Sequence, residues 1–198
     1  MDLDFLKERI RDAEEKDRVA EAVELLRGYL TLDPANSHLG YTYGQNLRVL
    51  GRLSEAEAVL TALDLSSVPE KKRYLIHLNL AQIYEARGEF IRSEAMYRLA
   101  AEESPESTVP WVFLAVFLLN SERVNDAKAA LARGLQASGD LDEVHHNLGN
   151  CYRAEGNLEA AMKEYQKAIN LDPTDATSLA KLEDVIAAAV AREELRAQ

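Results

Sequence analysis

The sequence of 198 residues has few of the features that mark secreted or membrane proteins. Its one cysteine, Cys151, excludes an internal disulfide. Residues 1–12 are charged from the second position and lack the basic and then apolar pattern of a secretory signal. The longest apolar run, residues 109–119, is shorter than the roughly 18 to 20 apolar residues that a membrane-spanning helix needs. We therefore expect a cytoplasmic protein that does not enter a membrane.

Basic residues are in the minority. Lysine and arginine number 23 against 34 aspartate and glutamate residues, which gives a net charge of −11. This balance opposes binding to phosphate backbones and to anionic lipid surfaces. An apolar fraction of 47% is nevertheless ordinary for a folded protein. The composition predicts a folded chain with no nucleic-acid or membrane partner.

Motifs of catalysis and cofactor binding are also missing. The sequence contains no phosphate loop, no His-Glu-x-x-His pair and no nucleophile elbow. His145, His146 and Cys151 are metal-ligating types, but their spacing does not bring them together on one turn of a helix. We expect no enzyme, no catalytic residue, no cofactor and no metal site.

What the sequence does contain is a repeat. Residues 142–175 read as a helix, a Gly-Asn turn, a second helix and a proline stop, and the same skeleton recurs every 34 residues. The register places units at 3–36, 37–70, 74–107, 108–141 and 142–175. Only residues 71–73 interrupt it. A fixed period of this length predicts stacked helix pairs.

Small residues recur where the two helices of a pair would cross. Antiparallel helices approach closely only where the side chains at the crossing are short. Unit position 20 holds Ala22, Ala56, Ser93, Ala127 and Ala161, whereas position 24 holds Leu26, Leu60, Tyr97, Leu131 and Tyr165. Position 8 is small in four units, at Gly44, Ala81, Ala115 and Gly149, with Ile10 as the exception. The alternation predicts that small and large side chains pack against one another across each pair.

Turn residues agree with this register. Gly51, Gly88 and Gly156 occupy position 15, where the first helix is expected to end in a left-handed residue. Asp17 and Glu122 replace glycine in the first and fourth units, which leaves room for a different turn geometry there. Residues 67–70 have the spacing of a capping box, and the third unit's first helix is expected to begin about a turn before its register position.

These positions resemble the tetratricopeptide repeat family, in which bulky residues at unit positions 4, 7, 11 and 24 alternate with small ones at 8, 20 and 27. The resemblance implies a single domain over residues 1–198, an all-α right-handed superhelical solenoid of five antiparallel helix pairs. A final helix, residues 176–196, carries an apolar stripe and is expected to cap the last pair. The stripe comprises Leu179, Leu182, Val185, Ile186, Ala189 and Val190.

The resemblance also implies a function. In this family the first helices of successive units line a concave groove that holds a peptide or a partner helix. The groove positions of the fourth unit are apolar, and we expect hydrophobic contacts from Val112, Phe113, Val116 and Leu119. The polar groove positions expected to orient a partner are Asn79, Gln82, His146, Asn147, Asn150 and Arg153. The expected function is thus a non-enzymatic scaffold that binds a protein or peptide.

The apolar fourth unit or the C-terminal helix could instead be a homodimer interface, which would make the chain a self-associating structural protein. A carboxylate clamp for the acidic tails of heat-shock chaperones is not supported. Lys7 matches that pattern, but Arg11 and Thr42 stand where asparagines are required.

Overall fold

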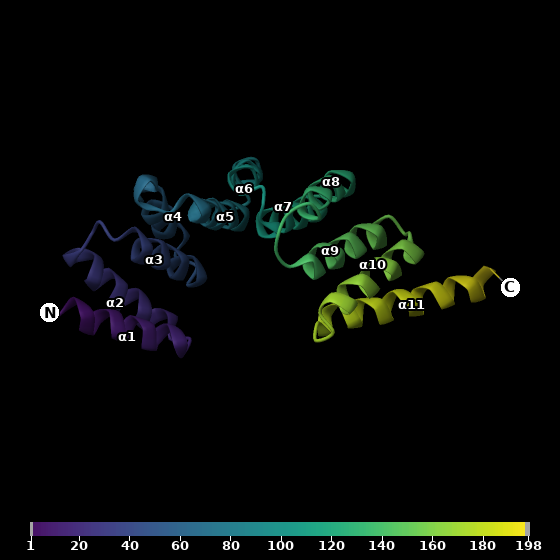
Figure 1. Ribbon diagram of the computed structural model, residues 1–198, viewed down its shortest axis with the longest axis horizontal. Helices are drawn as coiled ribbons and strands as arrows, with labels where there is room; N and C mark the ends of the chain where they lie inside the picture. The colour runs from purple at the N-terminus through teal and green to yellow at the C-terminus, as the bar shows by residue number, and fades with distance from the viewer. Residues whose placement is uncertain (1, 197–198) are drawn as a thin grey trace. The chain divides into compact units, whose positions relative to one another are not determined.

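The structure of this chain, a computed structural model, describes residues 2–196, which form eleven α-helices and one short 3-10 helix (Figure 1). The predicted all-α fold of paired helices is confirmed. Within the described range, no helix is both long enough and apolar enough to cross a membrane. The elements are α1 (Leu3–Glu15), α2 (Val19–Leu32), α3 (Ser37–Val49), α4 (Leu53–Thr61), η1 (Leu65–Ser67), α5 (Glu70–Ala86), α6 (Phe90–Glu103), α7 (Thr108–Asn120), α8 (Val124–Gly134), α9 (Leu141–Ala154), α10 (Leu158–Leu171) and α11 (Ala176–Arg196).

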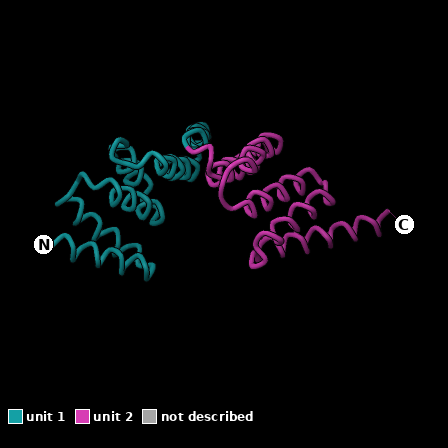
Figure 2. Tube along the Cα trace, viewed as in Figure 1, with its two compact units in different colours: residues 1–103 teal, residues 104–198 magenta. Residues whose placement is uncertain are grey.

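The helices group into two compact units (Figure 2). Unit 1, residues 1–103, contains α1 to α6, and unit 2, residues 104–198, contains α7 to α11. In unit 1 the pairs are α1 with α2, α3 with α4 and α5 with α6; in unit 2 they are α7 with α8 and α9 with α10, and α11 packs on α10. A single domain over the whole chain stays a prediction.

The small positions hold the pairs together as predicted. Ala22, Ala56, Ala127 and Ala161 are fully buried. A Cβ atom added to Gly44 would lie 2.6 Å from the side chain of Leu60, and one added to Gly149 would lie 2.6 Å from the ring of Tyr165. Each glycine therefore makes room for the large residue of the opposite helix.

The turns inside the pairs have one geometry. Gly51, Gly88 and Gly156 have φ of 73°, in the left-handed region, as predicted. Asp17 and Glu122 adopt the same region, with φ of 51° and 61°. The turns of the first and fourth units thus do not differ from the others, although an L-residue in this region costs about 1–2 kcal/mol.

The start of α5 combines one correct and one wrong expectation. The helix begins at Glu70, so the backward extension is confirmed. The capping box is wrong, because the residue before the helix is Pro69, with no side-chain cap, and the Ser67 hydroxyl donates to the Asp64 carbonyl at 2.6 Å. Local hydrogen bonds within η1 take the serine away from the helix start.

Candidate functional site

The apolar helix α7 forms the floor of a hollow in unit 2. Val112, Phe113 and Val116 line a space of about 480 Å³ together with residues of α9 and the start of α11. Val112 is 7% exposed, whereas Phe113 and Val116 are each 37% exposed. Leu119, one turn further on, is half-buried and does not line the hollow. Three of the four predicted hydrophobic contacts are therefore brought to one place.

The rim of the hollow is acidic. Besides His146, Asn147 and Thr177, it contains the carboxylates Asp142, Glu143, Asp172 and Asp175. The sequence had indicated a floor flanked by amides and a few cations. No lysine or arginine is among the residues that line the hollow. The sequence interpretation missed this charge.

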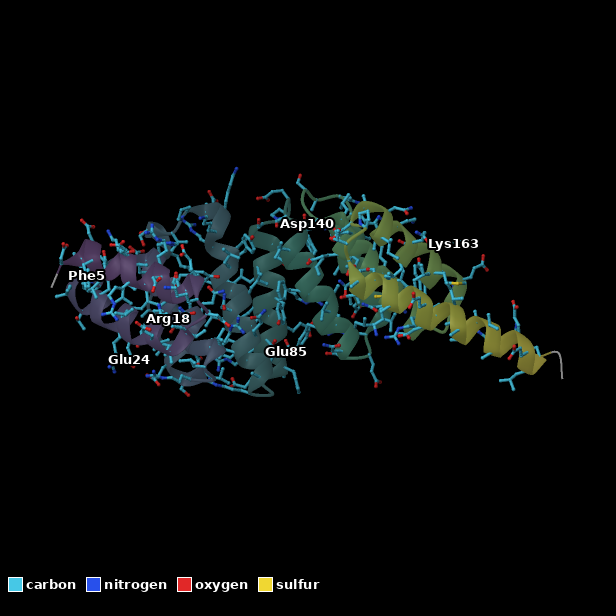
Figure 3. All side chains as sticks on the ribbon, turned by 90° about the horizontal axis from the view of Figure 1, so that it is seen from below. Phe5, Arg18, Glu24, Glu85, Asp140 and Lys163 are labelled. Atoms are coloured by element: carbon cyan, nitrogen blue, oxygen red, sulfur yellow. The ribbon has the colours of Figure 1, made fainter. Side chains whose placement is uncertain are left out.

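Three of the four carboxylates are there because two helices begin at the rim, and the fourth, Asp172, is the C-cap residue of α10. Asp142 and Glu143 lie in the first turn of α9, whose N-cap residue is Asp140, labelled in Figure 3. Asp175 accepts a hydrogen bond from the Thr177 N–H at 2.9 Å at the start of α11. Negative side chains are stabilising at helix N-termini. The 34-residue period places the starts of successive first helices side by side, and this was the signal from which the acidic rim could have been predicted.

Two of the carboxyl groups have shifted pKa values. Loss of water raises the pKa of Glu143, and repulsion from Asp142, Asp140 and Asp175 raises it further. The carboxyl group of Glu143 is partly shielded from water at the rim, although the residue as a whole is exposed. Burial alone would raise the pKa of Asp175, but hydrogen bonds from the side chain and backbone of Ser178 outweigh it and lower the pKa. The ionised form of Asp175 is thus stabilised, whereas the ionised form of Glu143 is destabilised by burial and by its acidic neighbours.

His146 is tied into the hollow's wall. Its Nδ1 lies 2.7 Å from the hydroxyl of Ser178 and 4.0 Å from Oδ2 of Asp175. Burial lowers the pKa of His146, so the ring is neutral near pH 7. Residues 2–196 contain no group of three histidine, cysteine, aspartate or glutamate side chains that could hold a metal ion.

The polar residues predicted further along α9 are largely engaged in packing. The Asn147 amide donates to the carbonyl of Glu143 at 2.8 Å, and its side chain lies at the edge of the hollow. Oδ1 of Asn150 accepts a hydrogen bond from the Tyr165 hydroxyl at 2.8 Å. Asn150 and the exposed Arg153 do not line the hollow.

The predicted polar residues of unit 1 lie elsewhere. Asn79 is 6% exposed; its amide donates to the Tyr41 hydroxyl at 3.1 Å and its oxygen accepts from Nε of Arg48 at 2.9 Å. These bonds hold α3 against α5, so Asn79 has a structural role in the packing. Gln82 is half-buried one turn further along α5.

Unit 1 has a hollow of its own, of about 430 Å³, between α3, η1 and α5. Its walls are mostly apolar, with Tyr41, Leu75 and Ile76 among them, and His38 and Lys72 at its edge. Neither Asn79 nor Gln82 lines it. No pattern in the sequence had predicted this hollow, because η1, which supplies one wall, is a short helix at the end of the second unit that the repeat pattern does not include.

The stacked helix pairs, their left-handed turns and their glycine contacts define a helical-repeat protein. Residues 13–74 match a family profile described as tetratricopeptide repeat, and residues 149–182 match one described as TPR repeat. By these two matches the chain is a TPR repeat protein.

Solved structures share the fold. The chain is similar to TTC0263, a TPR protein of Thermus thermophilus, with a TM-score of 0.71 and 16% identity over 93% of this chain and 99% of that one. It is also similar to the first TPR of Spaghetti bound to the HSP90 peptide SRMEEVD, with a TM-score of 0.55, 16% identity and coverage of 61% of this chain and 95% of that one.

A relative by sequence is the protein O-mannosyl-transferase Tmtc1 of Drosophila melanogaster, which is 28% identical over 148 residues. The match covers 68% of this chain but only 17% of the fly protein. The chain thus corresponds to a small part of that relative. Proteins of the repeat family mediate protein–protein interactions.

Proposed function

We propose that this chain is a non-enzymatic protein-binding scaffold and that a peptide segment or helix of a partner docks in the hollow of unit 2, against α7. The observation that carries the proposal is the half-open apolar floor. Phe113 and Val116 are large side chains, each 37% exposed, at the bottom of a hollow of about 480 Å³. Covering them with an apolar partner side chain would remove that surface from water, at roughly 25 cal/mol per Å².

The polar neighbours support a binding role. His146 and Asn147 present hydrogen-bonding groups at the rim, and amide side chains can orient an extended backbone. Leu119, Asn150 and Arg153 of unit 2 stay candidates for contacts with a longer partner, and Gln82 stays a separate candidate contact within unit 1. Asn79 would have to break its bonds to Tyr41 and Arg48, so we give it no contact in this proposal.

The proposal includes no catalytic activity. The transferase activity in the fly relative's name belongs to a protein of which this chain matches only 17%. A cytoplasmic location is part of the proposal and agrees with a single cysteine that is buried.

The test is a pull-down from the native organism with three versions of the chain. Wild type should retain a partner, Phe113→Asp should lose it, and Phe5→Asp should retain it. Phe5 is a matched control because it is 54% exposed on α1, far along the chain from the hollow. The circular dichroism of each variant should stay helical.

Val116→Asp guards against a folding defect in the first variant. If Phe113→Asp unfolds, loss of the partner by a folded Val116→Asp variant supports docking at α7. Retention of the same partner by a folded hollow variant would refute docking at α7.

A second candidate function is self-association through α11. Val185 is buried against the rest of unit 2, but Leu179, Ile186 and Val190 on the same helix are about half exposed. Their spacing of seven and four residues puts them on one side of the helix. Light scattering at micromolar concentration tests this candidate: a dimer that Ile186→Asp converts to monomer would favour it, and a wild-type monomer would exclude it.

A further inference from the structure

We propose that the segment docked in the unit 2 hollow is cationic and amphipathic: a large apolar side chain packs on Phe113 and Val116, and flanking lysine or arginine side chains reach the carboxylates of the rim. This inference rests on the proposed function and adds the partner's chemistry to it. Figure 1 shows the elements that would surround such a segment, α7, α9 and the start of α11.

The carboxylates at the rim of the hollow lack basic partners. Four of the ten residues that line the hollow are carboxylates, and none is a lysine or arginine. Within residues 2–196, Asp142, Glu143 and Asp172 form no salt bridge, and the one basic side chain that Asp175 approaches within 4.0 Å is His146, which is neutral near pH 7. Elsewhere on the surface acidic residues do find partners, for example Glu57, which pairs with Arg87 and Arg92.

The helix N-termini at the rim do not cancel this charge. Each N-terminus contributes the equivalent of about half a positive charge. The starts of α9 and α11 together therefore offset about one of the four negative charges, while the end of α10 at Asp172 adds the equivalent of about half a negative charge. Lys181, one turn further along α11, does not line the hollow; its Nζ lies 3.9 Å from Oδ2 of Asp184, and its charge reaches the hollow only so far as to help lower the pKa of His146. The hollow keeps a net negative charge that a cationic partner would compensate.

The acidic rim lies next to exposed apolar side chains. A lone acidic cluster would suit any cation, but here the carboxylates border an apolar floor. A small cation would leave Phe113 and Val116 exposed, and a neutral apolar segment would desolvate the carboxylates without compensation. A segment with both apolar and basic side chains satisfies the floor and the rim together.

The same chemistry argues against an acidic partner. The peptide bound to Spaghetti, SRMEEVD, carries three carboxylic side chains. Such a peptide would place like charges beside Glu143, whose pKa is already raised by burial and by its acidic neighbours. The unit 2 hollow should therefore select against it.

The experiment uses the full chain and three short fluorescein-labelled peptides of equal length. The first carries leucine and phenylalanine on one side and lysine at the remaining positions. The second replaces each lysine by glutamate, and the third keeps the lysines but replaces the apolar residues by serine. Fluorescence anisotropy at about 0.15 M salt, where weak long-range attraction is screened, should give the first peptide at least about tenfold tighter binding than either of the others.

Matched variants separate the rim from the protein's overall negative charge. Asp142→Asn/Glu143→Gln should weaken binding of the first peptide by about fivefold or more. Glu193→Gln/Glu194→Gln changes the net charge equally, but on an exposed stretch of α11 outside the hollow, and should leave the affinity within about twofold. Equal weakening by the two double variants would overturn the inference, because it would mean diffuse attraction only. Glu143→Gln alone provides the same comparison if the first double variant loses helical content.

A variant of the apolar floor separates the partner's charge from the position of the docking site. Phe113→Ser/Val116→Ser should weaken the first peptide by about fivefold or more if docking on α7 is correct. If the glutamate peptide binds as tightly as the lysine peptide and both depend on the floor, the partner's proposed charge is wrong but the docking site stands. If no peptide's affinity depends on the floor, both the inference and the proposed site fail.

Discussion

Gly149→Ala tests the idea that small residues set the spacing of each helix pair. An alanine Cβ at this position would lie 2.6 Å from two ring atoms of Tyr165 and 2.9 Å from a third. The ring is fully buried and its hydroxyl is bonded to Asn150, so it has little freedom to move away. Gly28, inside α2, is the comparison, because an added Cβ would meet nothing within 4 Å.

The expected change in the free energy of unfolding follows from two opposing effects. Replacing glycine by alanine inside a helix gains about 0.8–1.0 kcal/mol at either position. Only Gly149→Ala adds the cost of overpacking, typically about 1–3 kcal/mol. Gly28→Ala should therefore stabilise its unit by about 1 kcal/mol, while Gly149→Ala should leave unit 2 less stable by about 1 kcal/mol. Because the helix contribution is common to both, the difference between the two variants measures the overpacking.

The assay is a urea titration with two probes. Trp111 is the chain's single tryptophan and lies in α7, so its fluorescence follows unit 2. Far-ultraviolet circular dichroism follows the helices of both units, which matters because repeat proteins can unfold in more than one step. If Gly149→Ala raises the Trp111 midpoint as much as Gly28→Ala raises the dichroism midpoint, the close contact does not constrain the pair and the reasoning is refuted.

Three further predictions concern single side chains. Glu122→Gly should stabilise unit 2 by about 0.5–1 kcal/mol, because glycine avoids the cost of φ at 61° but loses more chain entropy on folding; a lower Trp111 midpoint in urea would contradict this. Cys151 should resist iodoacetamide at pH 8 in the native protein and react in urea, since burial raises the pKa of its thiol to about 11; rapid native labelling would show that α9 opens. Glu143→Gln should raise the melting temperature at pH 7 but not at pH 4. The gain in the free energy of unfolding at pH 7 should be less than about 1 kcal/mol. Folding raises the pKa of this carboxyl above its usual 4.5, and such a group makes the protein less stable as the pH rises from the unfolded-state pKa to the folded-state pKa. An equal effect of the substitution at both pH values would assign the change to packing instead.

Much of the fold could be predicted from residue spacing alone. The 34-residue period, the buried alanines at position 20 and the glycines opposite Leu60 and Tyr165 are local patterns whose consequence depends only on neighbouring helices. The left-handed turns at Asp17 and Glu122 show that the register outweighs residue preference. Packing of the flanking helices fixes those turns, so the conformational cost of a side chain there is tolerated.

The candidate site was predictable only in part. The repeat register placed apolar residues at the groove positions of α7, and Phe113 and Val116 are each 37% exposed at the hollow. The repeat register could not show that the amide oxygens of Asn79 and Asn150 accept hydrogen bonds from Arg48 and Tyr165. Hydrogen-bond partners from another helix depend on side-chain rotamers, which residue spacing does not encode.

By itself, the sequence determined that this chain folds into paired helices of the tetratricopeptide type, because small and large residues alternate at fixed intervals across every pair. The tertiary structure alone decided the chemistry of the hollow. Asp142, Glu143 and Asp175 lie at or just before the start of a helix, where a carboxylate is favoured locally, and Asp172 is the C-cap residue of α10. Only the stacking of α9 and α11 beside α7 brings those four charges to the rim of one apolar floor, since electrostatic character at a surface depends on distances that are set after the helices have packed.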